Sequence, residues 1–187
     1  MELKKILDVR RSTRKFLEQP VEQQKLERVC QMALQAPSSR NSRSTRLMVV
    51  TDKEKLEALA KMRDYGSAFM KNATAAIIVM GDKEASDLWL TNCVISATIL
   101  QLAIVDESLA SCWVQIDGRP VLQAEPDGKL AEDYVRELLD IPSKYGLLCA
   151  IALGYSDFQP ASLPPYEGEE RILWKYALIR QGDKESV

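Results

Sequence analysis

The hydrophobic and polar positions of this chain change period several times, and each period predicts one kind of element. Leu3, Ile6 and Leu7 share one face of a short first helix. After Pro20, apolar residues recur at the i, i+3, i+4, i+7 and i+8 spacing of an amphipathic helix. This helix should end before Pro37, because the residue preceding a proline is disfavoured in the helical region. The apolar positions of the second helix are Leu26, Val29, Cys30, Ala33 and Leu34.

Four apolar runs predict strands, and the second and fourth lack polar alternation, which indicates that both of their faces are covered. Three helices are predicted between them: one capped by Thr51 or Asp52, one over residues 87–104, and one running from Leu130 to Leu139. The chain has no internal repeat or linker, so residues 1–187 are predicted to form one mixed α/β (α+β) domain. The predicted strands are 47–51, 75–80, 111–116 and 146–154.

Two further segments raise the question of a partner. Residues 87–104 predict a helix with apolar residues around its whole axis, which is expected in a core or at a subunit interface. After Gly154, proline and glycine residues predict an extended tail over about 156–187 that carries large apolar side chains but no strand. Such a tail must pack on something, and the two alternatives are a partner subunit and its own chain.

Composition narrows the possible functions. The formal net charge of −2 argues against a nucleic-acid partner, which requires a broad basic face. The absence of histidine removes Ser-His-Asp and Cys-His catalysis, and no paired metal-ligand spacing is present, so we predict neither a catalytic side chain nor a metal. The four cysteines are far apart in apolar runs, which favours reduced thiols. Without a signal peptide or a long apolar span, we expect a cytoplasmic protein with no membrane partner.

Two polar stretches carry the candidate chemistry. Residues 10–16 read Arg-Arg-Ser-Thr-Arg-Lys-Phe, and guanidinium groups with hydroxyls at this density suit a phosphate, although a solvated basic turn is the simpler explanation of this stretch alone. Residues 37–43 form a loop rich in hydrogen-bond donors, for which a solvated connector is the alternative. Because no glycine-rich nucleotide fingerprint is present, the two stretches together suit a phosphorylated cofactor that brings its own reactivity.

These stretches resemble motifs of the FMN-dependent nitroreductase family. Arg10-Arg11-Ser12-Thr13-Arg14-Lys15-Phe16 resembles the family's RRSxRxF opening, and residues 36–43 resemble its APSxxNxQPW loop. Ser111-Cys112-Trp113-Val114 is similar to the family's GLGSCWVG strand, and Leu153-Gly154-Tyr155 to its LGYP end. The order and spacing of the motifs agree through about Tyr155.

The resemblance implies a mainly antiparallel sheet flanked by helices, in an intertwined homodimer that exchanges its C-terminal tails and holds FMN at the interface. It implies a ping-pong oxidoreductase in which NADH or NADPH reduces the flavin and a nitroaromatic, quinone or similar small-molecule acceptor reoxidises it. Residues of the other subunit would complete each site. The implied FMN-binding residues are Arg10, Arg11, Ser12 and Arg14 at the phosphate, Pro37, Ser38, Ser39, Asn41 and Arg43 from the partner's loop, and Trp113, Val114, Gln115 and Ile116 beside the ring.

The chain also departs from the family pattern. Arg43-Ser44-Thr45 stands where Gln-Pro-Trp is usual, which adds a cation toward the ring. Residues 163–166 read Leu-Pro-Pro-Tyr in the region where a further phosphate-binding cation is frequent, with Arg171 or Lys175 as substitutes. These departures keep two alternatives open, namely different flavin chemistry (flavin fragmentation or reductive dehalogenation) and flavin binding without catalysis.

Overall fold

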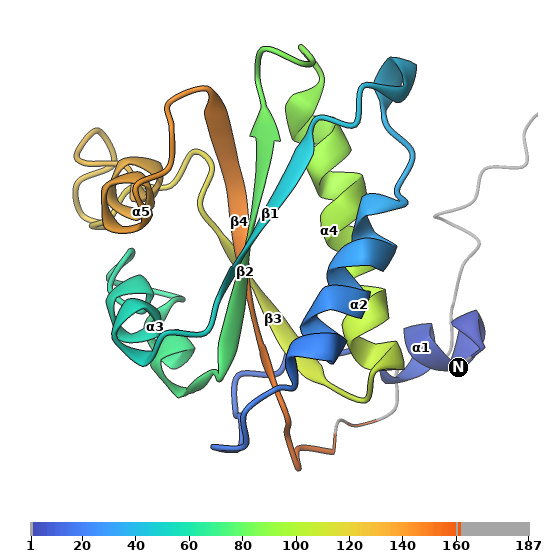
Figure 1. The fold of residues 1–187 in the computed structure, drawn as a ribbon. Helices are drawn as coiled ribbons and strands as arrows, with labels where there is room; N and C mark the ends of the chain where they lie inside the picture. Colours follow the sequence, from blue (N-terminus) through green and yellow to red (C-terminus); the bar gives the residue numbers. More distant parts are fainter. Residues whose placement is uncertain (1, 160, 162–187) are drawn as a thin grey trace, which may run out of the picture.

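The computed structural model describes residues 2–159 and 161, and at its centre lies a four-stranded antiparallel sheet in the order β1-β2-β4-β3 (Figure 1). Helices cover both faces of the sheet, which confirms the predicted mixed α/β fold. The strands are β1 (Thr45–Val50), β2 (Ala75–Asp82), β3 (Ala110–Gln115) and β4 (Tyr145–Gly154). The helices are α1 (Leu3–Val9), α2 (Gln23–Leu34), α3 (Lys53–Leu59), α4 (Trp89–Asp106) and α5 (Ala131–Leu139), and the 3-10 segments are η1 (Ser39–Asn41) and η2 (Ala68–Asn72).

The two central strands carry a core on each side. Every residue of β2 is buried, as its unbroken apolar pattern predicts. Ile77 and Val79 point into a core with α2 and α4, whereas Ile78 packs in a second core with α3 and α5. Both faces of β2 and β4 are therefore covered, and this prediction is confirmed.

Helix α4 is apolar around its axis but is buried on one face only. Cys93, Ala97 and Leu100 are fully buried in the core shared with α2 and the sheet. Leu90 and Val94, on another face, are 36% and 43% exposed. Of the described helices, α4 has the length and hydropathy of a membrane span, yet its packing is that of a core helix with one uncovered apolar side. One face of α4 therefore has the predicted core environment, and a subunit interface on the uncovered face stays a prediction.

Local signals place several element ends. Asp52, rather than Thr51, caps α3, because its carboxylate accepts a hydrogen bond from the backbone N–H of Lys55 at 2.8 Å. In α1 only Ile6 is buried, so the predicted apolar face is largely open in the described chain. The 3-10 segment η2 was not predicted. Of the predicted tail, only residues 156–159 and 161 can be described, and the remainder lies outside the described residues.

Candidate functional site

The cationic stretch runs along the outer edge of β3. Ser12 forms a parallel bridge with Ser111, and the backbone N–H of Thr13 donates to the Ser111 carbonyl at 2.9 Å. Thr13 is buried, whereas its neighbours Ser12 and Arg14 are exposed. The extended backbone therefore fixes the segment to the sheet through Thr13 and presents the hydroxyl and guanidinium groups on the outside.

The arginines of this segment have different surroundings. Arg11 donates to the backbone carbonyls of Asp8, Arg10 and Ala161 at 2.8–3.0 Å, so its guanidinium group orders the chain around it. The guanidinium carbon of Arg14 lies 5.8 Å from the centre of the Phe69 ring in η2. Within residues 2–159 and 161, neither Arg10 nor Arg14 has an ion-pair partner, which leaves both charges available to an anion.

The second predicted stretch forms a loop that Asn92 holds in place. This buried side chain in the first turn of α4 accepts a hydrogen bond from the backbone N–H of Ser39 at 2.9 Å. Its amide group donates to the hydroxyls of Ser44 at 2.9 Å and Ser42 at 3.2 Å. Asn92 was missed by the sequence analysis, although an amide side chain in the first turn of a mostly apolar helix is a signal that could have found it.

The same loop has an unusual backbone. Arg40, Asn41 and Arg43 have φ angles of 50°, 51° and 47°, in the left-handed region that costs a non-glycine residue roughly 1 kcal/mol or more. Two internal hydrogen bonds hold this shape, from the Arg43 N–H to the Ser38 hydroxyl at 2.9 Å and from Arg43 Nε to Asn41 Oδ1 at 3.2 Å. Pro37, Asn41 and Arg43 remain exposed. Backbone strain of this kind is concentrated at functional sites.

Within one chain the two stretches lie at opposite ends of the sheet (Figure 1). Ser12 is beside Ser111, and the strand register aligns Ser111 through Leu153 with Ala75, the first residue of β2. The loop ends at Ser44, whose carbonyl accepts from Asp82, the last residue of β2. At about 3.3 Å per residue, the seven steps along β2 separate the two stretches by roughly 23 Å. One chain therefore does not bring these residues together.

The residues predicted beside the ring divide between the two sides of β3. Val114 and Ile116 are buried in the core, and the Ile116 N–H donates to the Leu148 carbonyl at 3.0 Å. Backbone groups of an antiparallel strand alternate in direction, so Ser111 and Gln115 face the outer edge. The half-buried Trp113 donates from its indole nitrogen to the Gln115 side chain at 2.9 Å. The backbone N–H of Gln115 therefore faces outward, whereas that of Ile116 faces β4.

Arg63 is a further candidate site residue, which no sequence pattern indicated. Its guanidinium group donates to the outward carbonyl of Gln115 at 3.0 Å and lies 4.0 Å from the centre of the Tyr65 ring. Its Nε is shielded from solvent and has no hydrogen-bond partner among the described residues. A shielded charged donor without a partner is costly, and a bound acceptor at the β3 edge would relieve this cost.

Together these residues form a donor-rich edge beside β3. Arg10, Ser12 and Arg14 provide charge and a hydroxyl at one end, which fits a phosphate. The Gln115 N–H and Arg63 provide donors farther along the strand, which fit an acceptor-bearing ring. The donor set of this edge therefore fits FMN.

The thiols offer no nucleophile. Burial raises the pKa of Cys30 and Cys93 to about 11 and that of Cys149 well above its ordinary value. Burial also raises the pKa of Cys112, although nearby Arg14 and Ser12 oppose the shift. The four cysteines form no disulfide, in agreement with the prediction of reduced thiols, and their raised pKa keeps the thiols protonated near pH 7. The described residues contain no cluster of potential metal ligands.

Comparisons with known proteins agree with the motifs. Residues 7–64 match the model of the nitroreductase family. An FMN-dependent nitroreductase structure from Clostridium difficile R20291 is 37% identical, has a TM-score of 0.84, and covers 91% of this chain and 97% of its own. A protein of Archaeoglobus fulgidus named "Putative NADH dehydrogenase/NAD(P)H nitroreductase" is 27% identical, over 90% of this chain and 91% of its own length. A structure of the same name from Bacteroides thetaiotaomicron is 26% identical, with a TM-score of 0.81 and coverage of 92% and 96%.

Proposed function

The chain belongs to the nitroreductase family, and on that premise we propose that it is an FMN-dependent oxidoreductase that uses NADH or NADPH to reduce a nitroaromatic, a quinone or a similar small molecule. The observation that carries the proposal is the donor-rich edge of β3. There, Arg10, Arg14 and the outward N–H of Gln115 lie along one side of the strand, with Arg63 Nε beside them. Among the described residues, neither Arg10 nor Arg14 has an ion-pair partner, and Arg63 Nε has no hydrogen-bond partner. The names of the relatives support flavin and nicotinamide cofactors.

In this proposal FMN, when bound, supplies the redox chemistry, and the chain binds and orients it. Arg10, Ser12 and Arg14 hold the phosphate, and Arg11 keeps that segment in place through its three carbonyl contacts. The Gln115 N–H and Arg63 hydrogen-bond to the polar edge of the ring. Val114, Ile116 and the Trp113–Gln115 hydrogen bond keep β3 in place behind it.

We further propose a homodimer in which the loop carrying Pro37, Ser38, Ser39, Asn41 and Arg43 completes the site of the partner subunit. Two observations support this arrangement. The loop lies roughly 23 Å from the phosphate-binding stretch of its own chain. The exposed Leu90 and Val94 of α4 provide an uncovered apolar surface. The exchange of C-terminal tails remains a prediction. The cytoplasmic location also remains a prediction, and the four cysteines without a disulfide support it, because disulfides are rare in the reducing cytosol.

The absorption spectrum of the purified protein tests this function. We expect flavin bands that NADH or NADPH bleaches anaerobically and that a nitro compound or quinone restores. Flavin bands that neither nicotinamide bleaches would favour the alternatives, namely other flavin chemistry or binding without catalysis. A colourless protein that takes up no added FMN would overturn the proposal.

Arg10→Ala tests the phosphate site separately. We expect it to weaken FMN binding by about 1.5–3 kcal/mol, the scale of a hydrogen bond to a charged group. Lys5→Ala is a matched control, because it removes an exposed cation from the preceding helix α1. Equal FMN affinity of the two variants would refute the phosphate assignment.

A further inference from the structure

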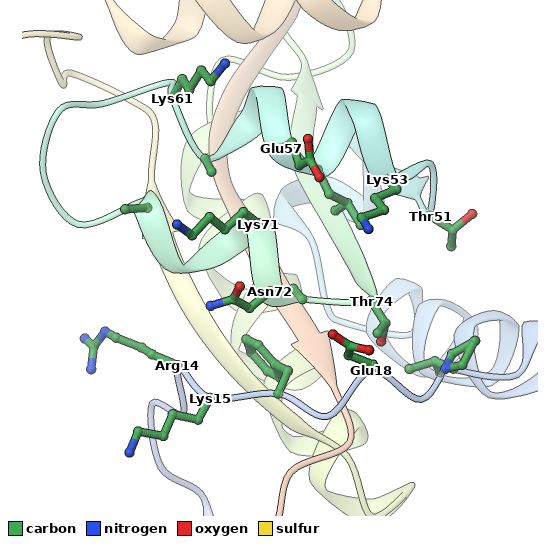
Figure 2. A pocket seen from close by; sticks show the side chains of 17 residues that line it. Arg14, Lys15, Glu18, Thr51, Lys53, Glu57, Lys61, Lys71, Asn72 and Thr74 are labelled. Carbon is green, nitrogen blue, oxygen red and sulfur yellow. The ribbon is translucent and has the colours of Figure 1, made fainter.

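A cavity of about 1040 Å³ opens on the α3 side of the sheet (Figure 2). Its walls are α3, the η2 segment and the stretch that follows the donor-rich edge, from Arg14 to Val21. The buried side chains of Leu56, Ala60 and Ala73 contribute apolar surface. This volume lies just above the range of roughly 300–1,000 Å³ that is usual for small-molecule sites, so the cavity can hold a ligand the size of a nucleotide.

The polar lining of this cavity is mostly cationic. Arg14, Lys15, Lys53, Lys61 and Lys71 outnumber the carboxylates Glu18 and Glu57 five to two, although the chain as a whole is slightly acidic. None of the five cations forms an ion pair with the part of the chain that the structure describes. An excess of unpaired positive charge around a partly apolar cavity favours an anionic ligand with an apolar part.

Thr74 adds an independent indication of a ligand. It lines the same cavity, and its hydroxyl is shielded from solvent without a hydrogen-bond partner among residues 2–159 and 161. A shielded hydroxyl without a partner costs free energy. A polar group bound at this wall would remove that cost.

We propose that this cavity binds the adenosine-phosphate end of the reducing dinucleotide and favours NADPH through the additional 2′-phosphate. The inference rests on the proposed function and deepens it, because Arg14 belongs both to the FMN-binding edge and to the cavity wall. The apolar surface suits an adenine ring, and the carboxylates can accept from its amino group or from ribose hydroxyls. The 2′-phosphate adds nearly two negative charges beside the lysines.

Calorimetric titration with adenosine 2′,5′-bisphosphate tests the site without any turnover. We expect the flavin-loaded Lys53→Gln/Lys71→Gln variant to bind the bisphosphate about tenfold more weakly than wild type, since two exposed cation contacts are lost. Lys55→Gln is the matched control on the same helix, because its amine donates to the Leu138 carbonyl and does not line the cavity. Adenosine 5′-monophosphate should bind wild type more weakly than the bisphosphate does, and the Lys53→Gln/Lys71→Gln substitutions should lower its affinity less.

Steady-state kinetics provides the second readout. The double variant should raise the KM for NADPH several-fold and the KM for NADH less, with kcat unchanged, which is the signature of lost binding at a remote part of the substrate. Bisphosphate affinity equal in the double variant and in Lys55→Gln, or bisphosphate binding no stronger than that of the monophosphate, would overturn the inference. If dithionite bleaches the flavin but neither nicotinamide does, the proposed function fails, and the titration still decides whether the cavity is a nucleotide-phosphate site.

Discussion

Asn92 is the residue whose replacement best tests how the loop at residues 37–43 is held. Asn92→Ala removes the acceptor of the Ser39 N–H at 2.9 Å and the donors to Ser44 and Ser42 at 2.9 and 3.2 Å. The serine hydroxyls can rotate toward other partners, but the backbone N–H cannot. An unsatisfied donor costs about 1–3 kcal/mol and each of the two remaining hydrogen bonds about 1 kcal/mol, so we expect the free energy of unfolding to fall by about 3–5 kcal/mol.

Chemical denaturation of the flavin-free protein measures this loss, and FMN titration measures its consequence for the site. Without Asn92 the left-handed residues Arg40, Asn41 and Arg43 can relax, so FMN affinity should also fall, by about tenfold. Thr98→Ala is the control, because Thr98 is exposed on the same helix and donates only to the Val94 carbonyl one turn earlier. An unfolding free energy within 0.5 kcal/mol of wild type would refute the anchoring role. If Asn92→Ala shows the expected decrease in unfolding free energy but binds FMN as tightly as wild type, the loop is not part of the FMN site.

Three further predictions concern other parts of the chain. Arg63→Leu should lower FMN affinity about tenfold, and Arg63→Lys should recover part of that loss because it restores the charge, as FMN titration would show. Gly146→Ala should lower the free energy of unfolding by about 1–3 kcal/mol, since a Cβ there would overlap the Trp89 ring, and denaturation would measure it. The hydrogen bond from Arg28 holds the pKa of Glu107 below its ordinary value of 4.5. The pair's stabilisation is therefore complete above about pH 4.5 and is lost as the pH falls, so acid should destabilise wild type more than Glu107→Gln in denaturation series at several pH values.

The spacing of apolar residues predicted where the helices and strands lie, but not which strands pair or which helix faces pack. The second predicted strand, 75–80, corresponds to β2 (Ala75–Asp82), and both of its faces are buried. A strand that is apolar at every position would expose apolar side chains to water if either face were uncovered. The order β1-β2-β4-β3 is set by pairing between distant segments, which no period encodes. For α4, composition showed an apolar helix but could not show that Val94 faces outward while Cys93 is buried.

In the candidate site, too, the sequence indicated the residues of local motifs but not those whose role depends on distant contacts. The motifs located Arg10, Ser12 and Arg14, since local sequence determines an extended cationic stretch. Arg63 and Asn92 were missed because their roles depend on partners about fifty residues away, Gln115 for the first and Ser39 for the second. Asn92 nevertheless left a detectable signal in an apolar helix, whereas Arg63 lies in a segment without any distinctive pattern.

The position of the strained loop is the strongest physical argument for a site shared between two chains. Three left-handed non-glycine residues cost the fold roughly 3 kcal/mol or more, and Asn92 is buried to hold them in that shape. In its own chain this donor-rich loop lies at the opposite end of β2 from Arg10, Ser12 and Arg14, the proposed phosphate-binding residues. Strained backbone that its surroundings hold in place is concentrated where a protein binds or switches. A second copy, placed on the uncovered face of α4 near Val94, could bring this loop to the partner's donor-rich edge, and the strain would then serve to preorganise the shared site.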